Sequence, residues 1–259
     1  MADPLDIQRL QPAFPQIEIE HHVQIDSTNS RALELARSEQ IDRWRLILAE
    51  EQTAGRGRGA NRWFSAAGAV TFSFLLPAEM TLPQPDWPRL ALATGVAVCQ
   101  TIEAFEPRAL VGLKWPNDVF LNGRKVCGIL IEGISQPRPH LVVGIGVNVN
   151  NSFATAPAEL RQIATSIVDE TGREHDRTEV LRAVIHNFDR CGRELASDPA
   201  TLARHWQRYC LLTDCIVRVA TNSRQIVGRC QGIDEAGALL LQTEAGVERC
   251  VAGTVVSWE

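Results

Sequence analysis

A glycine-rich run with two arginines is the first group of residues that could do chemistry. It reads Gly55-Arg56-Gly57-Arg58-Gly59, followed by Arg62 and Trp63. Glycines let backbone amides turn toward an anion, and arginines add fixed positive charge. The run lacks the Gly-Lys-Ser/Thr ending of a phosphate-binding P-loop. A mobile surface loop or an arginine–glycine patch for nucleic acid would use the same residues, so the run alone leaves these alternatives open.

Lysines around a tryptophan form the second group. Lys114-Trp115-Pro116-Asn117-Asp118 precedes the pair Asn122-Gly123, which is typical of a type I′ hairpin turn, and Lys125 follows. Pro116 favours an extended residue before it, so Lys114 and Asp118 are expected at the ends of adjoining strands. Lys125 opens an apolar strand. It is either a solvated strand end or a functional lysine that faces the arginines.

Two glycines inside a β-branched run form the third group, in Gly144-Ile145-Gly146-Val147-Asn148. Glycine weakens a strand, so the close approach of a ligand or another backbone would explain the pair. A β-bulge explains it equally well.

The histidines point to no metal site. His21 and His22 lie on opposite faces of a predicted strand and cannot chelate together, and none of the six histidines shows a zinc-binding spacing. No nucleophile elbow supports a Ser-His-Asp triad. We therefore predict no metal-ligating residue.

Strands and helices must position these groups. Alternating apolar residues predict strands at 16–25, 45–51, 70–76, 110–114, 118–121, 125–132 and 141–149. The run Asp26-Ser27-Thr28-Asn29 is typical of a helix N-cap, with a helix continuing to about Ser38. Further helices are predicted at 87–105, 178–196 and from Asp198 to about 209. Residues 1–210 are thus expected to form an α/β (α+β) domain with one mixed sheet and flanking helices.

Short strands dominate the remainder. They are predicted at 216–219, 226–230, 238–242 and 247–251, separated by glycine and asparagine. Residues 211–259 are therefore expected to form a small SH3-like β-barrel domain.

Composition excludes several classes of protein. The 259 residues carry a net charge of −5, which argues against coating nucleic acid or an anionic membrane. No apolar run approaches the ~20 residues of a membrane helix, and the acidic N-terminus shows no secretory signal. Seven scattered cysteines without a Cys-x-x-Cys pair indicate reduced thiols. A cytoplasmic globular protein is expected.

Taken in order, the motifs resemble those of the biotin protein ligases. The matching segments are 26–29, 51–59 with Trp63, 114–118, 124–130 and 144–148, and the tail at 232–241 resembles that family's C-terminal domain. Each motif alone is weak, but five in the family's order are specific, and the resemblance covers nearly the whole chain.

The resemblance implies a fold like that of class II aminoacyl-tRNA synthetases and a two-step reaction with ATP and Mg²⁺. The biotin carboxylate attacks the α-phosphate of ATP, giving biotinyl-5′-AMP and pyrophosphate. A lysine of a biotin carboxyl carrier domain, from acetyl-CoA carboxylase or a related biotin enzyme, then attacks the mixed anhydride and releases AMP. Positive charge must offset the repulsion between the two anions.

The resemblance also assigns roles to matching residues. Those implied to bind biotin are Ser27, Thr28, Asn29, Gln52, Gly55, Arg56, Gly57, Arg58, Lys125, Gly144 and Gly146. Those implied to bind ATP are Arg56, Arg58, Trp63, Lys125 and Asn148. Lys125 is expected to be the principal catalytic residue, with Arg58 and Asp118 beside it. Asp118 either lies next to the acceptor lysine or holds Lys125.

Two departures from the family pattern matter. The roughly fifteen residues before the first strand leave no room for an N-terminal helix-turn-helix, so we expect the monofunctional type without DNA binding. Residues 151–162 correspond to a nucleotide-covering loop but give no adenine-contacting match. Binding to a membrane is not expected, and a homodimer is compatible with the resemblance.

Two rival functions remain. Lipoate attachment uses the same adenylation strategy and a similar lysine, although the glycine–arginine run and the C-terminal domain favour biotin. An arginine–glycine nucleic-acid binder would show salt-dependent retention on single-stranded RNA, but the net charge and the 6% aromatic content argue against it.

Overall fold

The computed structural model describes residues 4–77, 86–134, 138–154, 156–221 and 223–259. The chain divides into two compact units. Unit 1 contains residues 1–82 and 121–183, and unit 2 contains residues 83–120 and 184–259. The predicted site residues other than Asp118 all belong to unit 1.

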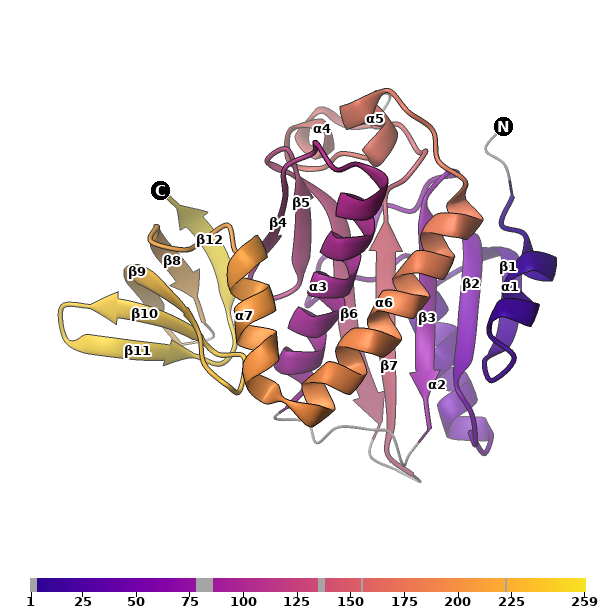
Figure 1. Cartoon of the computed structure of the whole chain (residues 1–259), viewed down its shortest axis with the longest axis horizontal. Helices are drawn as coiled ribbons and strands as arrows, with labels where there is room; N and C mark the ends of the chain where they lie inside the picture. Colours follow the sequence, from indigo (N-terminus) through magenta and orange to yellow (C-terminus); the bar gives the residue numbers. More distant parts are fainter. Residues whose placement is uncertain (1–3, 78–85, 135–137, 155, 222) are drawn as a thin grey trace. The chain divides into compact units, whose positions relative to one another are not determined.

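Unit 1 is built on a mixed sheet, as predicted (Figure 1). In spatial order its strands are β1 (Glu18–Ile25), β2 (Arg45–Gln52), β3 (Val70–Leu76), β7 (His140–Val147) and β6 (Arg124–Ile134). β1 and β2 are parallel, whereas the pairs β2–β3, β3–β7 and β7–β6 are antiparallel. A parallel doubly wound sheet is therefore excluded for this unit.

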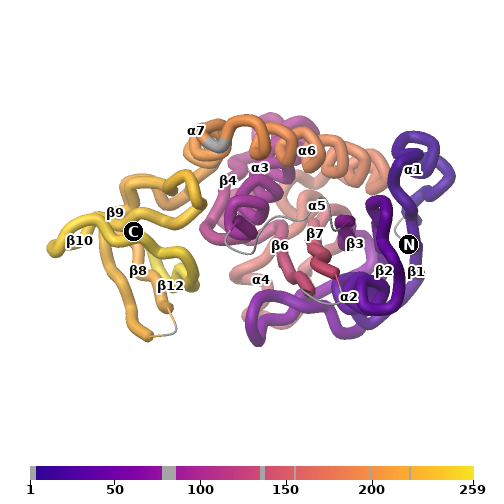
Figure 2. Tube along the Cα trace, turned by 90° about the horizontal axis from the view of Figure 1, so that it is seen from below, coloured from indigo at the N-terminus to yellow at the C-terminus, as the bar shows by residue number. Residues whose placement is uncertain are grey.

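Helix α2 (Thr28–Ser38) covers one face of this sheet (Figures 1 and 2). It begins after Ser27, whose hydroxyl accepts a hydrogen bond from Ser30 N, as expected of an N-cap. Its apolar stripe packs against β2, β3 and β7; the buried residues of this cluster include Ala32, Leu33, Leu35, Ala36, Ile47, Leu75 and Val142. The opposite face of the sheet carries the aromatic pair Phe72 and Phe74.

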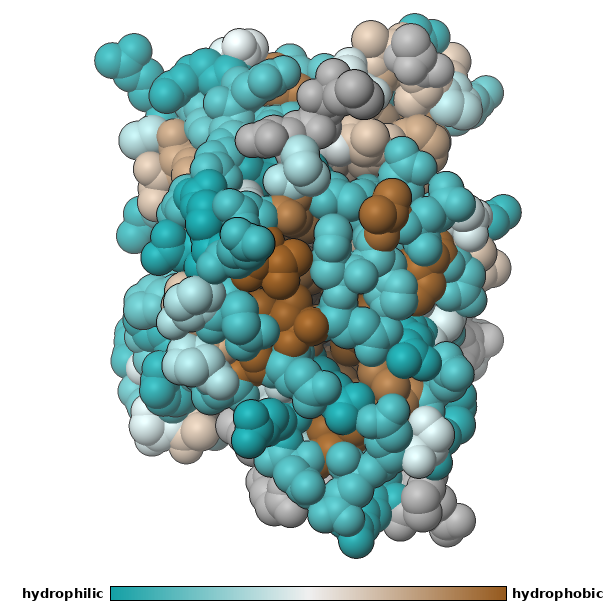
Figure 3. Space-filling view, turned by 90° about the vertical axis from the view of Figure 1, so that its right-hand side faces the viewer, coloured by the Kyte–Doolittle hydropathy of each residue, from teal (hydrophilic) through white to brown (hydrophobic). Residues whose placement is uncertain are grey.

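The edge strand β1 departs from one expectation. Alternation predicts that Val23 is buried together with Ile17, but the Val23 side chain is 77% exposed. β1 pairs only with β2 among the strands of unit 1, and an edge strand is incompletely covered. Figure 3 views the molecule from the side on which β1 lies in Figure 1, and hydrophobic residues gather there in a strip among mainly hydrophilic ones.

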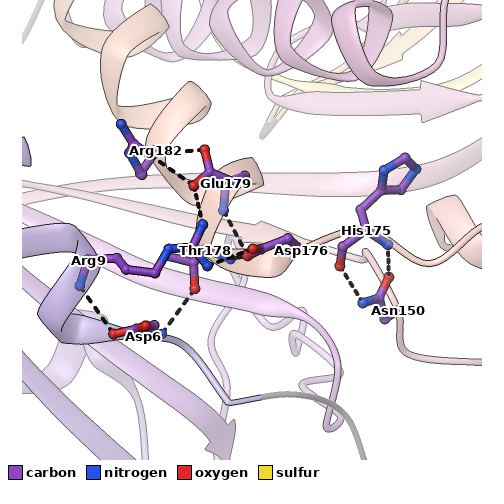
Figure 4. A network of polar contacts seen from close by, with 8 residues as sticks. All are labelled: Asp6, Arg9, Asn150, His175, Asp176, Thr178, Glu179 and Arg182. Atoms are coloured by element: carbon purple, nitrogen blue, oxygen red, sulfur yellow. Dashed lines mark hydrogen bonds and ion pairs between the residues drawn. The ribbon is translucent and has the colours of Figure 1, made fainter.

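Three short helices of unit 1 were not predicted from the sequence. They are α1 (Ile7–Ala13), α4 (Ala158–Ile163) and α5 (Ile167–Thr171). Asp6 caps α1, and its backbone N donates to Thr178 Oγ1 at 3.0 Å, which fastens the N-terminal segment to the start of α6 (Arg177–Ser197) (Figure 4). Helices this short are fixed by such contacts rather than by propensity.

Unit 2 contains helices and a small sheet. Its elements are α3 (Trp87–Phe105), β4 (Val111–Lys114), most of β5 (Asp118–Leu121), the later part of α6, and α7 (Pro199–Tyr209). The sheet that follows comprises β8 (Ile216–Ala220), β9 (Gln225–Ile233), β10 (Leu239–Thr243), β11 (Gly246–Cys250) and β12 (Thr254–Trp258). Its order is β11-β10-β9-β8-β12, with antiparallel pairs throughout.

The small C-terminal β domain is therefore confirmed, with β12 as an additional strand that the sequence pattern did not predict. All seven cysteines are free thiols in the structure. Among the described residues, no helix combines the length and hydropathy needed to cross a membrane.

Candidate active site

Three glycines leave bare backbone on the α2 side of the sheet. Gly146 pairs with Gly128 across β7 and β6, and Gly144 lies two residues before Gly146 in β7; we call these three residues the glycine floor. A Cβ on Gly144 would stand 2.0 Å from Asn29 Oδ1, and one on Gly146 would stand 2.3 Å from Trp63 Cε2. Both flanking registers are unbroken here. The β-bulge alternative is wrong, and close approach explains the glycines of β7.

Polar groups at the start of α2 form one wall beside the glycine floor. Ser27, Thr28 and Asn29 are all buried. Thr28 donates twice to Gln52 Oε1, from its backbone N at 2.7 Å and from its hydroxyl at 3.1 Å. Gln52 is the last residue of β2, so the helix start and the strand end are held together. The predicted biotin-binding residues of these two motifs thus lie in one hydrogen-bonded cluster.

Ser73 belongs to the same cluster but was missed from the sequence. Its hydroxyl donates to Asn29 Oδ1 at 2.6 Å and lies 2.7 Å from Thr28 Oγ1. In β3, Thr71 and Ser73 alternate with Phe72 and Phe74, although all four are buried. Polar residues on one face of a buried strand need hydrogen-bond partners, and that signal could have identified Ser73.

Glu132 is a second residue that the sequence reasoning missed. Asn29 Nδ2 donates to Glu132 Oε2 at 2.9 Å, and Arg56 Nη2 donates to Glu132 Oε1 at 2.5 Å. Glu132 is near the end of β6 on the side of the glycine floor, since it follows Gly128 by four residues along the strand. A carboxylate therefore joins the α2 wall to the glycine–arginine run.

The glycine–arginine run is folded as a narrow turn rather than an open loop. Gly57 N donates to Asn61 O at 2.9 Å, and Trp63 N donates to Gly55 O at 3.0 Å. Gly59 has φ +64° near the tip, where glycine is favoured. Arg58 is exposed at this turn, whereas Arg56 reaches back to Glu132. The structure thus gives different surroundings to Arg56 and Arg58, although they are only two residues apart in the sequence.

Trp63 and Lys125 meet above the glycine floor. Trp63 Cζ3 and the Cε and Nζ atoms of Lys125 all lie 3.3 Å from the point where a Cβ on Gly128 would stand. The Lys125 side chain is half-buried, and its carbonyl accepts from Thr165 N at 2.9 Å. Within the described part of the chain, the buried indole Nε1 of Trp63 has no hydrogen-bond partner. Its N–H is therefore a donor available to a ligand.

Asn148 is buried just beyond β7, and both ends of its amide are engaged. Its Nδ2 donates to Thr165 O at 3.0 Å, and its Oδ1 accepts from Asn151 Nδ2 at 3.1 Å. The backbone N of Asn148 donates to Val126 O, and that of Thr165 donates to Lys125 O, so Asn148 and Thr165 hold the start of β6 together. Asn150 adds a reciprocal pair of bonds with the backbone of His175, at 2.7 and 3.0 Å (Figure 4). The expected contact of Asn148 with nucleotide stays a prediction.

Residues 151–162, where the resemblance gives no adenine-contacting residue, pack beside the glycine–arginine run. Phe153 is buried in a small cluster with Ala156 and Ala164, and its ring centroid lies 5.9 Å from that of Phe64. Asp169 accepts from Phe153 N at 2.8 Å. Residue 155 lies outside the described residues.

The hairpin turn before Lys125 is anchored by Glu170. Its carboxylate accepts from Asn122 Nδ2 at 3.0 Å, Arg124 Nη2 at 2.6 Å and Thr165 Oγ1 at 2.8 Å. Burial would raise the pKa of Glu170, but these hydrogen bonds outweigh it and hold the pKa below its ordinary value. Asn122 and Gly123 both have positive φ, as the predicted type I′ turn requires.

The residues of the tryptophan motif lie mainly in unit 2. Trp115 is buried and donates from Nε1 to Gly237 O at 3.1 Å, while Lys114 Nζ lies 4.7 Å from the Trp258 ring. Both contacts join the motif to the C-terminal sheet of the same unit. Asp118 is half-buried at the start of β5, and its two alternative roles both stay predictions.

Comparisons with known proteins agree with these motifs. The family model described as "Biotin/lipoate A/B protein ligase family" matches residues 22–150, and "Biotin protein ligase C terminal domain" matches residues 216–258. A bifunctional ligase/repressor BirA of Bacillus spizizenii is 34% identical over 89% of this chain and 71% of its own length. A biotin–[acetyl-CoA-carboxylase] ligase of Paracoccus denitrificans is 34% identical over 85% of this chain and 92% of its own.

Solved structures show the same relationship. A biotin protein ligase from Aquifex aeolicus, in complex with biotin and ATP, superimposes with a TM-score of 0.79 at 29% identity, covering 93% of this chain and 98% of that one. The chain belongs to the biotin protein ligase family.

Proposed function

We propose that this enzyme is an ATP-dependent biotin ligase. It activates biotin as biotinyl-5′-AMP and transfers the biotinyl group to the acceptor lysine of a biotin carboxyl carrier domain. One observation carries the proposal: the hydrogen-bonded cluster at the α2 start borders the glycine floor, with cationic Arg56 and Lys125 beside it. The match with a relative named as a biotin–[acetyl-CoA-carboxylase] ligase covers 92% of that relative's length.

The polar cluster suits the uncharged ring system of biotin. A ureido group both donates and accepts hydrogen bonds, and it needs hydroxyl and amide partners within an otherwise apolar pocket. Thr28, Asn29 and Gln52 supply these groups, and Ser73 holds the Asn29 amide in position. The glycine floor leaves the backbone of β7 open to a flat ligand once Trp63 shifts from it.

Adenylation brings two anions together. A carboxylate oxygen of biotin attacks the α-phosphorus of ATP, a P–O bond forms, and the bond to the bridging oxygen breaks so that pyrophosphate leaves. Lys125 and Arg56 are positioned to offset the repulsion and to stabilise charge on the α-phosphate. The Trp63 Nε1 donor beside them serves the nucleotide in this proposal.

Transfer completes the reaction. The acceptor lysine, as the free amine, attacks the carbonyl carbon of the mixed anhydride, a C–N bond forms, and AMP leaves with the electron pair of the broken C–O bond. The glycine–arginine run would close over the anhydride and exclude water until the carrier domain docks. Asp118 serves either the acceptor lysine or Lys125.

Mg²⁺ enters the proposal with the nucleotide. Among the described residues, no three His, Cys, Asp or Glu side chains come together as a metal site. We therefore expect ATP phosphates and water to supply its ligands. A cytoplasmic location, a homodimer and the lack of nucleic-acid binding stay predictions.

The test offers the purified chain biotin or lipoate with MgATP and follows pyrophosphate release and acyl-AMP by mass spectrometry. We expect biotinyl-5′-AMP, and biotinylation of a carrier domain when one is added. Preference for lipoate, or no pyrophosphate release with biotin, would overturn the proposal.

A further inference from the structure

Glu132 carries a negative charge, although the proposed site binds two anions. A carboxylate beside such a site repels biotin and ATP unless its charge is used by the protein itself. Both Glu132 oxygens are used: Oε1 accepts from Arg56 at 2.5 Å and Oε2 accepts from Asn29 at 2.9 Å. Its side chain is only 22% exposed.

The contact with Asn29 fixes an amide orientation. Ser73 donates to Asn29 Oδ1 at 2.6 Å, so the Nδ2 end must point away from Ser73 and toward an acceptor. A carboxylate can only accept, and it therefore specifies this orientation. Asn29 Nδ2 also donates to Leu130 O, but at 3.4 Å this bond is much longer, so without Glu132 the amide orientation would be held more weakly.

The contact with Arg56 ties the turn formed by residues 55–63 to β6. Gly55, Gly57 and Gly59 make residues 55–59 costly to order, because glycine loses more conformational entropy than any other residue on folding. Arg56 has five N–H donors, and the bond to Glu132 uses one end of the guanidinium. This bond leaves further donors of the same guanidinium for an anion.

We infer that Glu132 is a positioning residue of the active site. It holds Arg56 and the Asn29 amide in their binding geometry before ligand arrives, and it acts through them rather than on the reacting atoms. The inference rests on the proposed function, since it assigns Arg56 and Asn29 to ligand binding. The Arg56 side chain is 40% exposed, and such a solvent-accessible ion pair adds little to stability, so the effect is expected in binding and segment order rather than in folding.

The first experiment measures segment order without any substrate. In Glu132→Gln, hydrogen–deuterium exchange of residues 55–63 should speed up about tenfold, because the charge-assisted bond to Arg56 is weakened. Glu20→Gln is the matched control: Glu20 also pairs with an arginine, Arg31 of α2, at 2.7 Å and with 29% exposure, away from the glycine floor. Unchanged exchange in Glu132→Gln would overturn the inference whatever the enzyme's substrate is.

The second experiment measures coupling in catalysis. Glu132→Gln should raise KM for biotin about tenfold with less than about a threefold change in kcat. The same substitution in an Arg56→Ala background should have a much smaller effect. An undiminished effect there would show that Glu132 does not act through Arg56. Glu132→Asp keeps the charge but shortens the side chain by one methylene, and it is measured in parallel in case Glu132→Gln folds poorly. Wild-type values for Glu132→Asp would also overturn the inference.

A wild-type chain that releases no pyrophosphate with biotin would instead count against the proposed function. In that case the exchange experiment still decides whether Glu132 orders the segment, so the two failures are distinguishable.

Discussion

At the residue scale, the proposed function assigns the Lys125 ammonium, which lies beside the Trp63 ring, to both the biotin carboxylate and the α-phosphate. Charge builds on phosphorus in the transition state, so its contribution grows as the reaction proceeds. Lys125→Ala should slow single-turnover pyrophosphate release by on the order of a hundredfold, roughly 3 kcal/mol of barrier. Biotin affinity should fall as well.

Two comparisons accompany that measurement. Lys125→Arg should restore little activity, because a planar guanidinium does not replace a compact ammonium in a tight site. Lys114→Ala should be much less damaging, since Lys114 lies against the Trp258 ring in unit 2. Near-normal pyrophosphate release by Lys125→Ala would shift the catalytic role to Arg56 and Arg58.

Residue types and spacing selected residues that the structure brings together, but not the contacts that connect them. The cap at 26–29, Gln52, Trp63, Lys125 and the glycines of β7 all lie in unit 1 around one floor. Ser73 and Glu132 were missed because their partner Asn29 is 44 and 103 residues away in sequence. Such pairs depend on strand register, which a single sequence does not specify here.

At the element scale, the close fit between α2 and β7 makes a definite prediction for Gly144. An added Cβ would stand 2.0 Å from Asn29 Oδ1, so Gly144→Ala must displace the buried Asn29 side chain and break its hydrogen bonds. We expect a loss of about 2 kcal/mol in the free energy of unfolding and a marked loss of biotin affinity by calorimetry. Gly192→Ala, in α6 with no atom within 4 Å, is the control and should not destabilise. Equal behaviour of the two variants would contradict the packing argument.

The turn formed by the glycine–arginine run carries the next prediction. Arg58 is exposed at its tip, whereas Arg56 is tied to β6. Arg58→Gly should therefore leave adenylation largely intact but release biotinyl-5′-AMP early, because the charge that retains the intermediate is removed. The readouts are free biotinyl-5′-AMP and labelling of bystander lysines.

Arg62→Gly, on the other arm of the same turn, controls for general loosening of the run. If Arg58→Gly binds no biotin and labels nothing, Arg58 is needed for binding rather than for retention.

The long helices were predicted well, whereas three short helices and one short strand were not. The expected helix at 87–105 agrees with α3 at both ends, and the α2 helix ends at Ser38 as predicted. By contrast α1, α4, α5 and β12 were missed. The three helices have five to seven residues, too few to show a helical period, and all four elements are held by contacts from distant segments.

At the scale of the whole molecule, the acid stability of unit 1 depends on buried carboxylates. Glu50 at the end of β2 accepts from Leu5 N at 2.8 Å and from Arg177 Nη1 at 2.8 Å, and His21 Nε2 lies 3.3 Å away. It thereby joins the N-terminal segment, the sheet and the start of α6. Burial would raise the pKa of Glu50, but these hydrogen bonds outweigh it, so its pKa lies below the ordinary 4.5.

A lowered carboxyl pKa gives a definite sign to the pH dependence. The unfolded chain binds a proton to Glu50 at a higher pH than the folded protein does, so the stabilisation is present above about 4.5 and is lost as the pH falls below it. Glu50→Gln should unfold more easily at pH 7 by about 3 kcal/mol, because Arg177 is only 2% exposed and loses its charged partner. The variant should also lose less stability than wild type between pH 5 and pH 3.5, because one of the protons taken up on unfolding is removed. Thermal unfolding across that range measures both effects, with Glu18→Gln, a substitution at a more exposed carboxylate, as control. Parallel pH profiles for Glu50→Gln and wild type would mean that other carboxylates dominate acid unfolding. The contacts of Glu50 with the N-terminal segment and with α6 would then not be what stabilises the fold in acid.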